Sequence, residues 1–174
     1  MKKADQSILV REYSPQDLEQ VLDLVREMEA ELAEKFPKVK IQSGAGDYRS
    51  RYLKPGNKYK FFVAETGNRI IGFLMGYPSL GTPEVDTMYD ILPVSPEWTT
   101  PEFYLQITYV SRNYRRRGVS TQLHRKIIQY ARAKGHQEVY ACIAKWNFPE
   151  LEVISSLEFK KKDLGYRYRM SLKL

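Results

Sequence analysis

One stretch of the sequence constrains the fold more than any other, because it joins a strand pattern to a helix pattern through a basic turn. The segment "FYLQITYVS" at 103–111 is rich in β-branched and aromatic residues and predicts a strand. Four arginines and Gly118 follow, and apolar residues then recur every third or fourth position up to about Lys134, where Gly135 ends a predicted helix. A strand that turns directly into a helix is typical of an α/β protein.

The other segments alternate between the same two patterns. The clearest is "YKFFVAETGNRIIGFLMGY" at 59–77, whose Gly67-Asn68 pair suits the tight turn of a hairpin. Residues 78–102 show no regular period and predict a long loop. Further strands are predicted over 8–14, over 138–144 and as a pair within 159–173, and further helices over about 15–36, 46–53 and 148–157. We therefore predict one α/β domain over 1–174 with helices on the faces of a single mixed sheet.

Charge and composition restrict the partners. The net charge of +7 favours an anionic partner, which could be a nucleic acid, a membrane surface or a phosphorylated ligand. Cys142 is the single cysteine, which excludes an internal disulfide, and with only two histidines no metal site is predicted. No apolar run reaches the length of a membrane span or a signal peptide, so we expect a cytoplasmic protein without a membrane partner.

The arginine turn has the chemistry of a pyrophosphate site. The first N–H groups of a helix have no partner within it, and the helix dipole adds positive charge there. Gly118 allows close approach, so backbone donors from about Arg116 to Ser120 can converge on an anion. The spacings of the Walker and Rossmann glycine loops are absent. The alternative, a solvated loop before a helix, stays open on this pattern alone.

Three segments resemble the GNAT N-acetyltransferase superfamily. "YVSRNYRRRGVSTQL" is similar to its acetyl-CoA-binding motif, V-x-P-x-x-R/Q-x-x-G-x-G/A-x-x-L, with Arg112 in place of the proline and Ser120 at the last small position. "VAETGNRIIGFLMGY" resembles the middle hairpin of the family, and "KWNFPELEVISSLEF" resembles its segment N-x-x-A-x-x-L-Y-x-x-x-G-F, although Glu158 replaces the glycine. The motif positions that match are Val110, Arg115, Gly118 and Leu123 within 110–123.

The resemblance implies a mixed, mostly antiparallel sheet with helices on both faces and a splay between the central strands 103–111 and 138–144. Acetyl-CoA would be the co-substrate, with its pantetheine arm in the splay and its pyrophosphate on the arginine turn. Asn147 would bind the arm, although a helix N-cap is an equal alternative for this residue. The coenzyme-binding residues implied are Tyr109, Val110, Ser111, Arg115, Arg116, Arg117, Gly118, Val119, Ser120 and Asn147.

The same resemblance implies transfer of an acetyl group to a primary amine of a small molecule or a peptide. The family's usual proton-donating tyrosine falls on Ile154, and its usual acidic strand residue falls on or near Gln106. Tyr109 is therefore our candidate proton donor, with packing as the alternative role. His124, one position past the apolar Leu123, is expected at the surface.

The long loop indicates the kind of acceptor. Residues 77–102 contain five acidic residues and no lysine or arginine. We take Asp86, Tyr89 and Asp90 as candidate substrate-binding residues for a cationic amine. Alternatively, the loop only solvates itself or docks a second subunit, which would make a homodimer.

Two other function classes remain. A GNAT-fold module that binds acetyl-CoA with little catalysis would explain the glutamine and isoleucine at Gln106 and Ile154. A nucleic-acid-binding domain would explain the net charge of +7, but the arginines gather at one turn and no nucleic-acid motif is present, so it ranks below the others.

Overall fold

The computed structural model describes residues 7–37, 44–79 and 100–174, and these form one seven-stranded sheet with helices on both faces. The strand order is β1-β2-β3-β4-β5-β7-β6, and β4 with β5 is the parallel pair among otherwise antiparallel neighbours. This confirms the predicted fold class. The strands are β1 (Leu9–Glu12), β2 (Lys60–Thr66), β3 (Arg69–Ser79), β4 (Glu102–Val110), β5 (Glu138–Ala144), β6 (Lys160–Asp163) and β7 (Arg167–Lys173).

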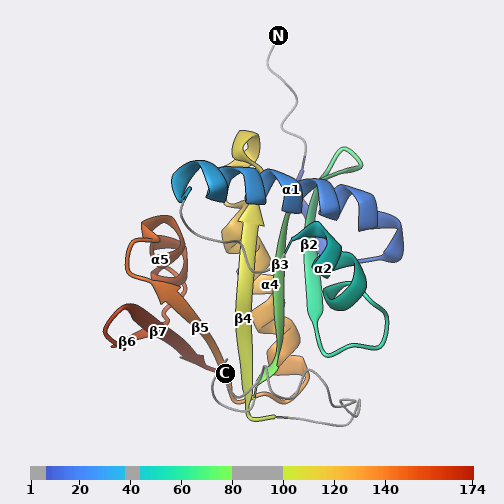
Figure 1. Cartoon of the computed structure of the whole chain (residues 1–174). Coiled ribbons are helices and arrows are strands. Elements are labelled where there is room, and N and C mark those ends of the chain that lie inside the picture. The colour runs from blue at the N-terminus through green and yellow to red at the C-terminus, as the bar shows by residue number, and fades with distance from the viewer. Residues whose placement is uncertain (1–6, 38–43, 80–99) are drawn as a thin grey trace.

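The helices divide between the two faces of the sheet. In Figure 1, α1 and α2 cross in front of the strands and α4 lies behind them, while α5 sits beside β5. The bounds are η1 (Pro15–Asp17), α1 (Leu18–Lys35), α2 (Ala45–Asp47), η2 (Tyr48–Tyr52), η3 (Arg112–Tyr114), α4 (Val119–Ala133) and α5 (Phe148–Ser155). The helix predicted over 46–53 is therefore the short α2 followed by one π turn, η2.

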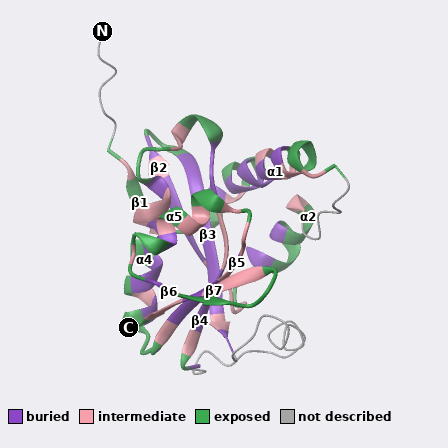
Figure 2. Cartoon of the chain, turned by 90° about the vertical axis from the view of Figure 1, so that its left-hand side faces the viewer, coloured by how far each residue is buried: buried purple, intermediate pink, exposed green. Residues whose placement is uncertain are grey.

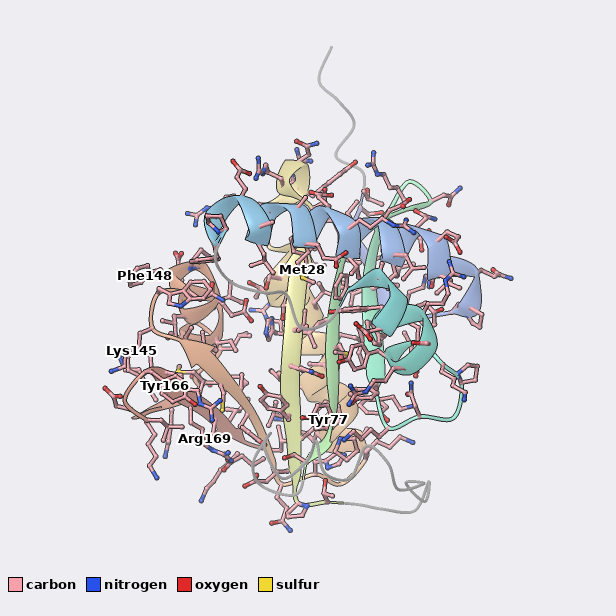
Figure 3. All side chains as sticks on the ribbon, viewed as in Figure 1. Met28, Tyr77, Lys145, Phe148, Tyr166 and Arg169 are labelled. Atoms are coloured by element: carbon pink, nitrogen blue, oxygen red, sulfur yellow. The ribbon has the colours of Figure 1, made fainter. Side chains whose placement is uncertain are left out.

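Each face of the sheet carries its own hydrophobic core. One core packs α4 against the sheet around Phe103, Leu123 and Ile127, and the other packs α1 around Val21, Val25 and Phe73, all with no exposed surface. Figure 2 shows the buried residues following the strands and the inner sides of the helices. Figure 3 shows side chains on both sides of the ribbon, with Met28 between α1 and the strands and Tyr166 at the periphery. The sheet therefore forms the middle layer, with helices packed on each of its faces.

The hairpin of β2 and β3 has the turn that its sequence predicts. Gly67 and Asn68 have φ values of 53° and 62°, the left-handed backbone that a two-residue type I′ turn needs at both positions. β3 continues to Ser79 and β4 begins at Glu102. Most of the predicted long loop, with Asp86, Tyr89 and Asp90, lies outside the described residues.

The predicted splay lies between β4 and β5. The two strands pair from Glu102 with Glu138 up to Leu105 with Ala141, and Gln106 is then an extra residue in a β-bulge opposite β3. Beyond that point β4 and β5 diverge, as Figure 1 shows at the upper end of the sheet. Parallel pairing therefore ends halfway along β4, and the upper half of its edge is not bonded to β5.

Candidate functional site: an anion cradle in the splay

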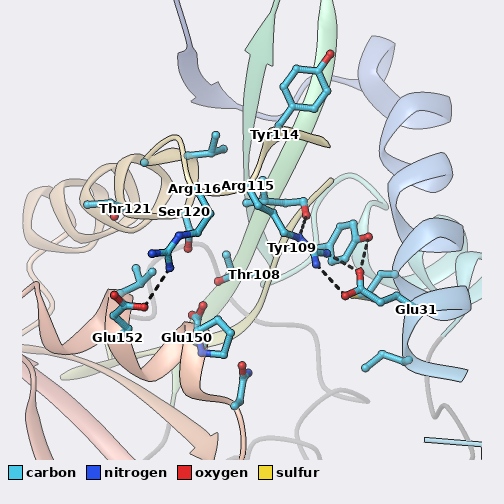
Figure 4. A pocket seen from close by; sticks show the side chains of 18 of the residues that line it. Glu31, Thr108, Tyr109, Tyr114, Arg115, Arg116, Ser120, Thr121, Glu150 and Glu152 are labelled. Carbon is cyan, nitrogen blue, oxygen red and sulfur yellow. Dashed lines mark hydrogen bonds and ion pairs between the residues drawn. The ribbon is translucent and has the colours of Figure 1, made fainter. Parts of the chain in front are cut away.

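A pocket of about 720 Å³ occupies the splay. Its walls are α1, the end of β4, the arginine turn, the first turn of α4, and α5 (Figure 4). At the far end of α1 the rings of Phe36 and Trp146 lie 4.7 Å apart and join α1 to the loop after β5. Of the predicted coenzyme-binding residues, those that line this pocket are Tyr109, Val110, Arg115, Arg116, Gly118, Val119, Ser120 and Asn147. Ser111 and Arg117 belong to the same turn but do not line it.

The start of α4 has the geometry of an anion cradle. Gly118 has a φ of 73°, and a Cβ added there would meet nothing within 4 Å, so the space in front of this turn is open. The first backbone bond of the helix runs from the Gln122 N–H to the Gly118 carbonyl at 3.0 Å. The N–H groups from Val119 to Thr121 precede this bond, and they are the donors that a helix start offers to an anion. The residues present therefore fit a pyrophosphate.

Arg115 does not point toward this cradle but turns inward to α1 (Figure 4). Its Nη atoms lie 2.8 and 2.5 Å from the two carboxylate oxygens of Glu31, and its Nε donates to the Val110 carbonyl at 2.9 Å. The Glu31 side chain is 10% exposed, and Lys35 and the Tyr109 hydroxyl also donate to it. The hydrogen bonds from Arg115 lower the pKa of Glu31 to about 2, against the opposing effect of burial.

A second carboxylate of α1 holds the beginning of the same turn. Glu27 Oε1 accepts from the Ser111 hydroxyl at 3.1 Å and from the Arg112 N–H at 3.0 Å. The turn is thus fixed to α1 at two points, one helical turn apart. The sequence signal for the contact between α1 and Arg115 was Glu31 itself. It lies three residues after Met28 on the buried face of α1, where an apolar residue would be expected.

The next two arginines remain at the surface. The backbone of Arg116 has a positive φ of 62°. Its side chain is 85% exposed, and its Nη1 lies 3.4 Å from the Oε2 of Glu152 in α5 (Figure 4). The Arg117 guanidinium lies 5.5 Å from the centre of the Tyr114 ring. These two side chains, unlike Arg115, can reorient toward a ligand without breaking a partly buried ion pair.

The open edge of β4 offers backbone groups to the pocket. The Ser111 N–H donates to Ile71 of β3 at 2.9 Å, so Ser111 and Tyr109 direct their N–H and C=O groups toward β3. Because these directions alternate along an antiparallel pair, Thr108 and Val110 direct theirs away from β3, toward the splay. An extended ligand can therefore pair with β4 here.

Asn147 stands at the N-cap position of α5 and lines the pocket. Its carbonyl accepts the Leu151 N–H at 3.1 Å, but among the described residues its side chain caps no N–H of the helix. The side-chain amide can therefore hydrogen-bond a molecule in the pocket, and its binding of the pantetheine arm stays a prediction.

Tyr109, the candidate proton donor, is 7% exposed and packs on the α1 face of the sheet. Its hydroxyl donates to Glu31 at 3.2 Å, and burial, reinforced by Glu27 and Glu31, raises its pKa well above the usual range. Tyr109 therefore keeps its proton, and catalysis by it stays a prediction. Ile154 is fully buried, and within the described part of the chain the buried Oε1 of Gln106 accepts no hydrogen bond.

The expectation of a surface position for His124 is wrong, since its side chain is fully buried. Nδ1 lies 2.9 Å from the Ser120 carbonyl, and Nε2 lies 3.0 Å from Glu150 of α5. The cause is the neighbouring helix, which covers a face of α4 that the sequence pattern alone leaves to solvent. His124 thereby lies between the first turn of α4 and Glu150 of α5.

Comparison with known proteins supports the fold and the family. The model of the acetyltransferase (GNAT) family matches residues 25–159. A search of curated protein sequences finds no match. Over the described residues, no group of metal-binding side chains and no helix long and apolar enough to cross a membrane is present.

Solved structures with this fold are similar over nearly the whole chain. The GNAT domain of S. lividans PAT has a TM-score of 0.72 at 16% identity and covers 100% of both chains. PaiA N-acetyltransferase from Thermoplasma acidophilum, in complex with coenzyme A, has a TM-score of 0.64 at 18% identity. The match covers 97% of this chain and 99% of the PaiA chain. A GCN5-related N-acetyltransferase from Kribbella flavida has a TM-score of 0.72 at 18% identity, covering 96% and 98%.

Proposed function

Because the chain belongs to the acetyltransferase (GNAT) family, we propose that it transfers the acetyl group of acetyl-CoA to a primary amine. Family membership confirms the predicted resemblance and acetyl-CoA as the co-substrate. The observation that carries the proposal is the cradle at Gly118, which opens into the same pocket as the unpaired edge of β4. One pocket thus offers donors for a pyrophosphate and a strand edge for an extended arm.

The chain contributes mainly binding and orientation to this reaction. The N–H groups of Val119 to Thr121 would hold the pyrophosphate, and the Thr108 and Val110 edge would align the arm. A Val110 N–H directed into the splay can also stabilise negative charge on the thioester oxygen. Acetyl-CoA would supply the acyl group as a thioester, and the amine must lose a proton before it attacks the carbonyl carbon. The C–N bond then forms as the C–S bond breaks, and the released CoA thiolate takes up a proton.

The acceptor remains defined by charge alone. We propose a cationic amine, supported by the five acidic residues and the absence of lysine and arginine within 77–102. Asp86, Tyr89 and Asp90 are the proposed contacts, and both a homodimer and a cytoplasmic location stay predictions. Nucleic-acid binding ranks lower, since Arg115 is committed to Glu31.

Calorimetric titration with acetyl-CoA and with free CoA tests the donor site, and a thiol-release assay across alkyl amines, polyamines and peptides tests the transfer. Micromolar binding of both coenzymes and amine-dependent thiol release are the expected results. If the wild-type protein binds neither acetyl-CoA nor free CoA, the proposal is refuted.

A binding module with little catalysis is the second candidate, and Gln106 favours it. An amide cannot take a proton from the amine. The carboxylates that line the pocket are Glu31, Glu150 and Glu152, and they lie against Arg115, His124 and Arg116 respectively. Gln106→Glu distinguishes the two. If the native site relies on water, the variant changes thiol release by only a few-fold. If the native protein only binds, Gln106→Glu is the change that would reveal amine-dependent turnover.

A further inference from the structure

Arg115 occupies a backbone acceptor that lies on the open edge of β4. By the alternation along this strand, the Val110 carbonyl points into the splay, where an extended ligand would pair with it. The Arg115 Nε donates a hydrogen bond to that carbonyl at 2.9 Å. The carbonyl keeps a second lone pair, but the guanidinium stands beside it, so the unobstructed groups on this edge are the Val110 N–H and both backbone groups of Thr108.

Glu31 holds the guanidinium in this orientation. The carboxylate of Glu31 accepts hydrogen bonds from both Nη atoms of Arg115. Its side chain is 10% exposed and also accepts hydrogen bonds from Lys35 and from the Tyr109 hydroxyl. A bidentate arginine–carboxylate pair restricts rotation of the guanidinium plane, so Nε stays aimed at Val110. Lysine could not make these three contacts at once, because its ammonium is a single point charge.

We propose that Arg115 is a positioning residue that sets the register of the pantetheine arm along β4, with Glu31 holding it in place, and that it is not a phosphate ligand. The proposal rests on acetyl-CoA binding as proposed above. Because the Arg115 guanidinium stands at the Val110 carbonyl and competes with the arm for it, the amides of the arm pair preferentially with Thr108 and with the Val110 N–H. Arg115 thereby fixes how far along the strand the thioester lies.

The neighbouring Arg116 provides the matched comparison. It is 85% exposed and opposite Glu152 at 3.4 Å, at the mouth of the cradle. Arg116 is therefore the side chain that can bind phosphate, and Arg115 the one that can orient the arm. The two roles predict different losses for ligands with and without pantetheine.

The test measures the Kd of two ligands by calorimetry: CoA, and 3′-phospho-ADP, which keeps the phosphates of CoA but lacks pantetheine. Arg115→Lys, Arg115→Gln and Glu31→Gln should each weaken CoA binding about tenfold and change the Kd of 3′-phospho-ADP less than about twofold. Arg116→Gln should weaken both ligands alike. Circular dichroism and thermal unfolding identify any variant that fails to fold, and Arg115→Lys keeps the charge as the mildest substitution.

The sign of the Glu31→Gln effect separates the alternatives. If Arg115 were a phosphate ligand restrained by Glu31, releasing it would strengthen the binding of both ligands, and Arg115→Lys would retain most of the affinity. Either result overturns the proposal, and so does an equal loss of both ligands in Arg115→Gln. A wild-type protein that binds 3′-phospho-ADP but not CoA also overturns it. If the wild type binds neither ligand, the proposed function itself fails.

Discussion

The two sides of the pocket are built from one run of arginines, yet they differ in how those arginines are held. On the α1 side, Arg115 forms a bidentate pair with a carboxylate that is 10% exposed. On the α5 side, the side chains of Arg116 and Glu152 are 85% and 70% exposed, and the Arg116 Nη1 lies 3.4 Å from the Glu152 Oε2. A partly buried bidentate pair costs more to break than an exposed pair, which contributes at most about 1 kcal/mol and exchanges with solvent.

This difference indicates a division of labour. The α1 side is preorganised, since Glu27 and Glu31 fix the turn and the β4 edge before any ligand arrives. The α5 side keeps charges that are free to exchange a protein partner for a phosphate. Preorganised groups reduce the entropy lost on binding, and exchangeable groups supply the charge.

The largest expected effect is at the junction between the two sides. Gly118→Asp should weaken CoA binding at least about 100-fold, or about 2.7 kcal/mol, because a carboxylate would project into the open space of the cradle. Aspartate tolerates the φ of 73°, so the fold should persist. Calorimetry measures the loss, and circular dichroism checks the fold.

Gly118→Asn is the matched control, since it has the same size and backbone tolerance without the charge. It should retain more affinity than the aspartate variant. Equal affinities in wild type and Gly118→Asp would show that the anion does not bind at this turn.

A smaller effect is expected from breaking the α1 side. Glu31→Gln should lower the free energy of unfolding at pH 7 by about 2 kcal/mol, because Arg115 and Lys35 lose their charged partner. The folded pKa of about 2 lies below the ordinary 4.5, so this stabilisation is complete above pH 4.5 and is lost as the pH falls toward 2.

Denaturant unfolding of wild type and Glu31→Gln at pH 7, 5 and 3 measures this difference. The gap between the two proteins should stay constant from pH 7 to 5 and narrow at pH 3. If the difference in the free energy of unfolding did not depend on pH, the charge of Glu31 would contribute little to the stability of its pair with Arg115.

On the α5 side we expect lost affinity without lost stability. Arg116→Gln should weaken CoA binding roughly tenfold, the contribution of one charge-assisted hydrogen bond. The free energy of unfolding should change by less than about 0.5 kcal/mol, since the side chain is 85% exposed. Calorimetry at two salt concentrations should show a weaker salt dependence in the variant. A destabilisation as large as that of Glu31→Gln would remove the distinction between the two sides.

The smallest expected effect has the opposite sign. Glu152→Gln removes the carboxylate that competes for Arg116, and CoA binding should strengthen about two- to threefold. Glu19→Gln, which removes an exposed partner of Arg49 away from the pocket, is the control and should leave the Kd unchanged. Weaker binding in Glu152→Gln would indicate that this carboxylate itself contacts the coenzyme.

Local chemistry was sufficient to predict much of the fold and the position of the cradle. The Gly67-Asn68 pair predicted a turn because few residues tolerate left-handed backbone at two successive positions, and both have positive φ. The arginine turn predicted an anion site because a glycine before a helix leaves backbone N–H groups open. Glu158, at the family's glycine position, keeps that backbone with a φ of 66°.

The direction of each arginine was decided only by the tertiary structure. Arg115 and Glu31 are 84 residues apart, and nothing in either segment pairs them. The burial of His124 likewise depends on α5, which follows β5 and covers that part of α4. Short-range sequence patterns determine which backbone N–H groups lack a partner within a turn or helix start, because this depends on residues within one turn of each other. The partner of each side chain depends on elements that meet only after the sheet has formed. Arg115, predicted to be one of the coenzyme-binding residues, there pairs with Glu31 of α1 and with the Val110 carbonyl of β4.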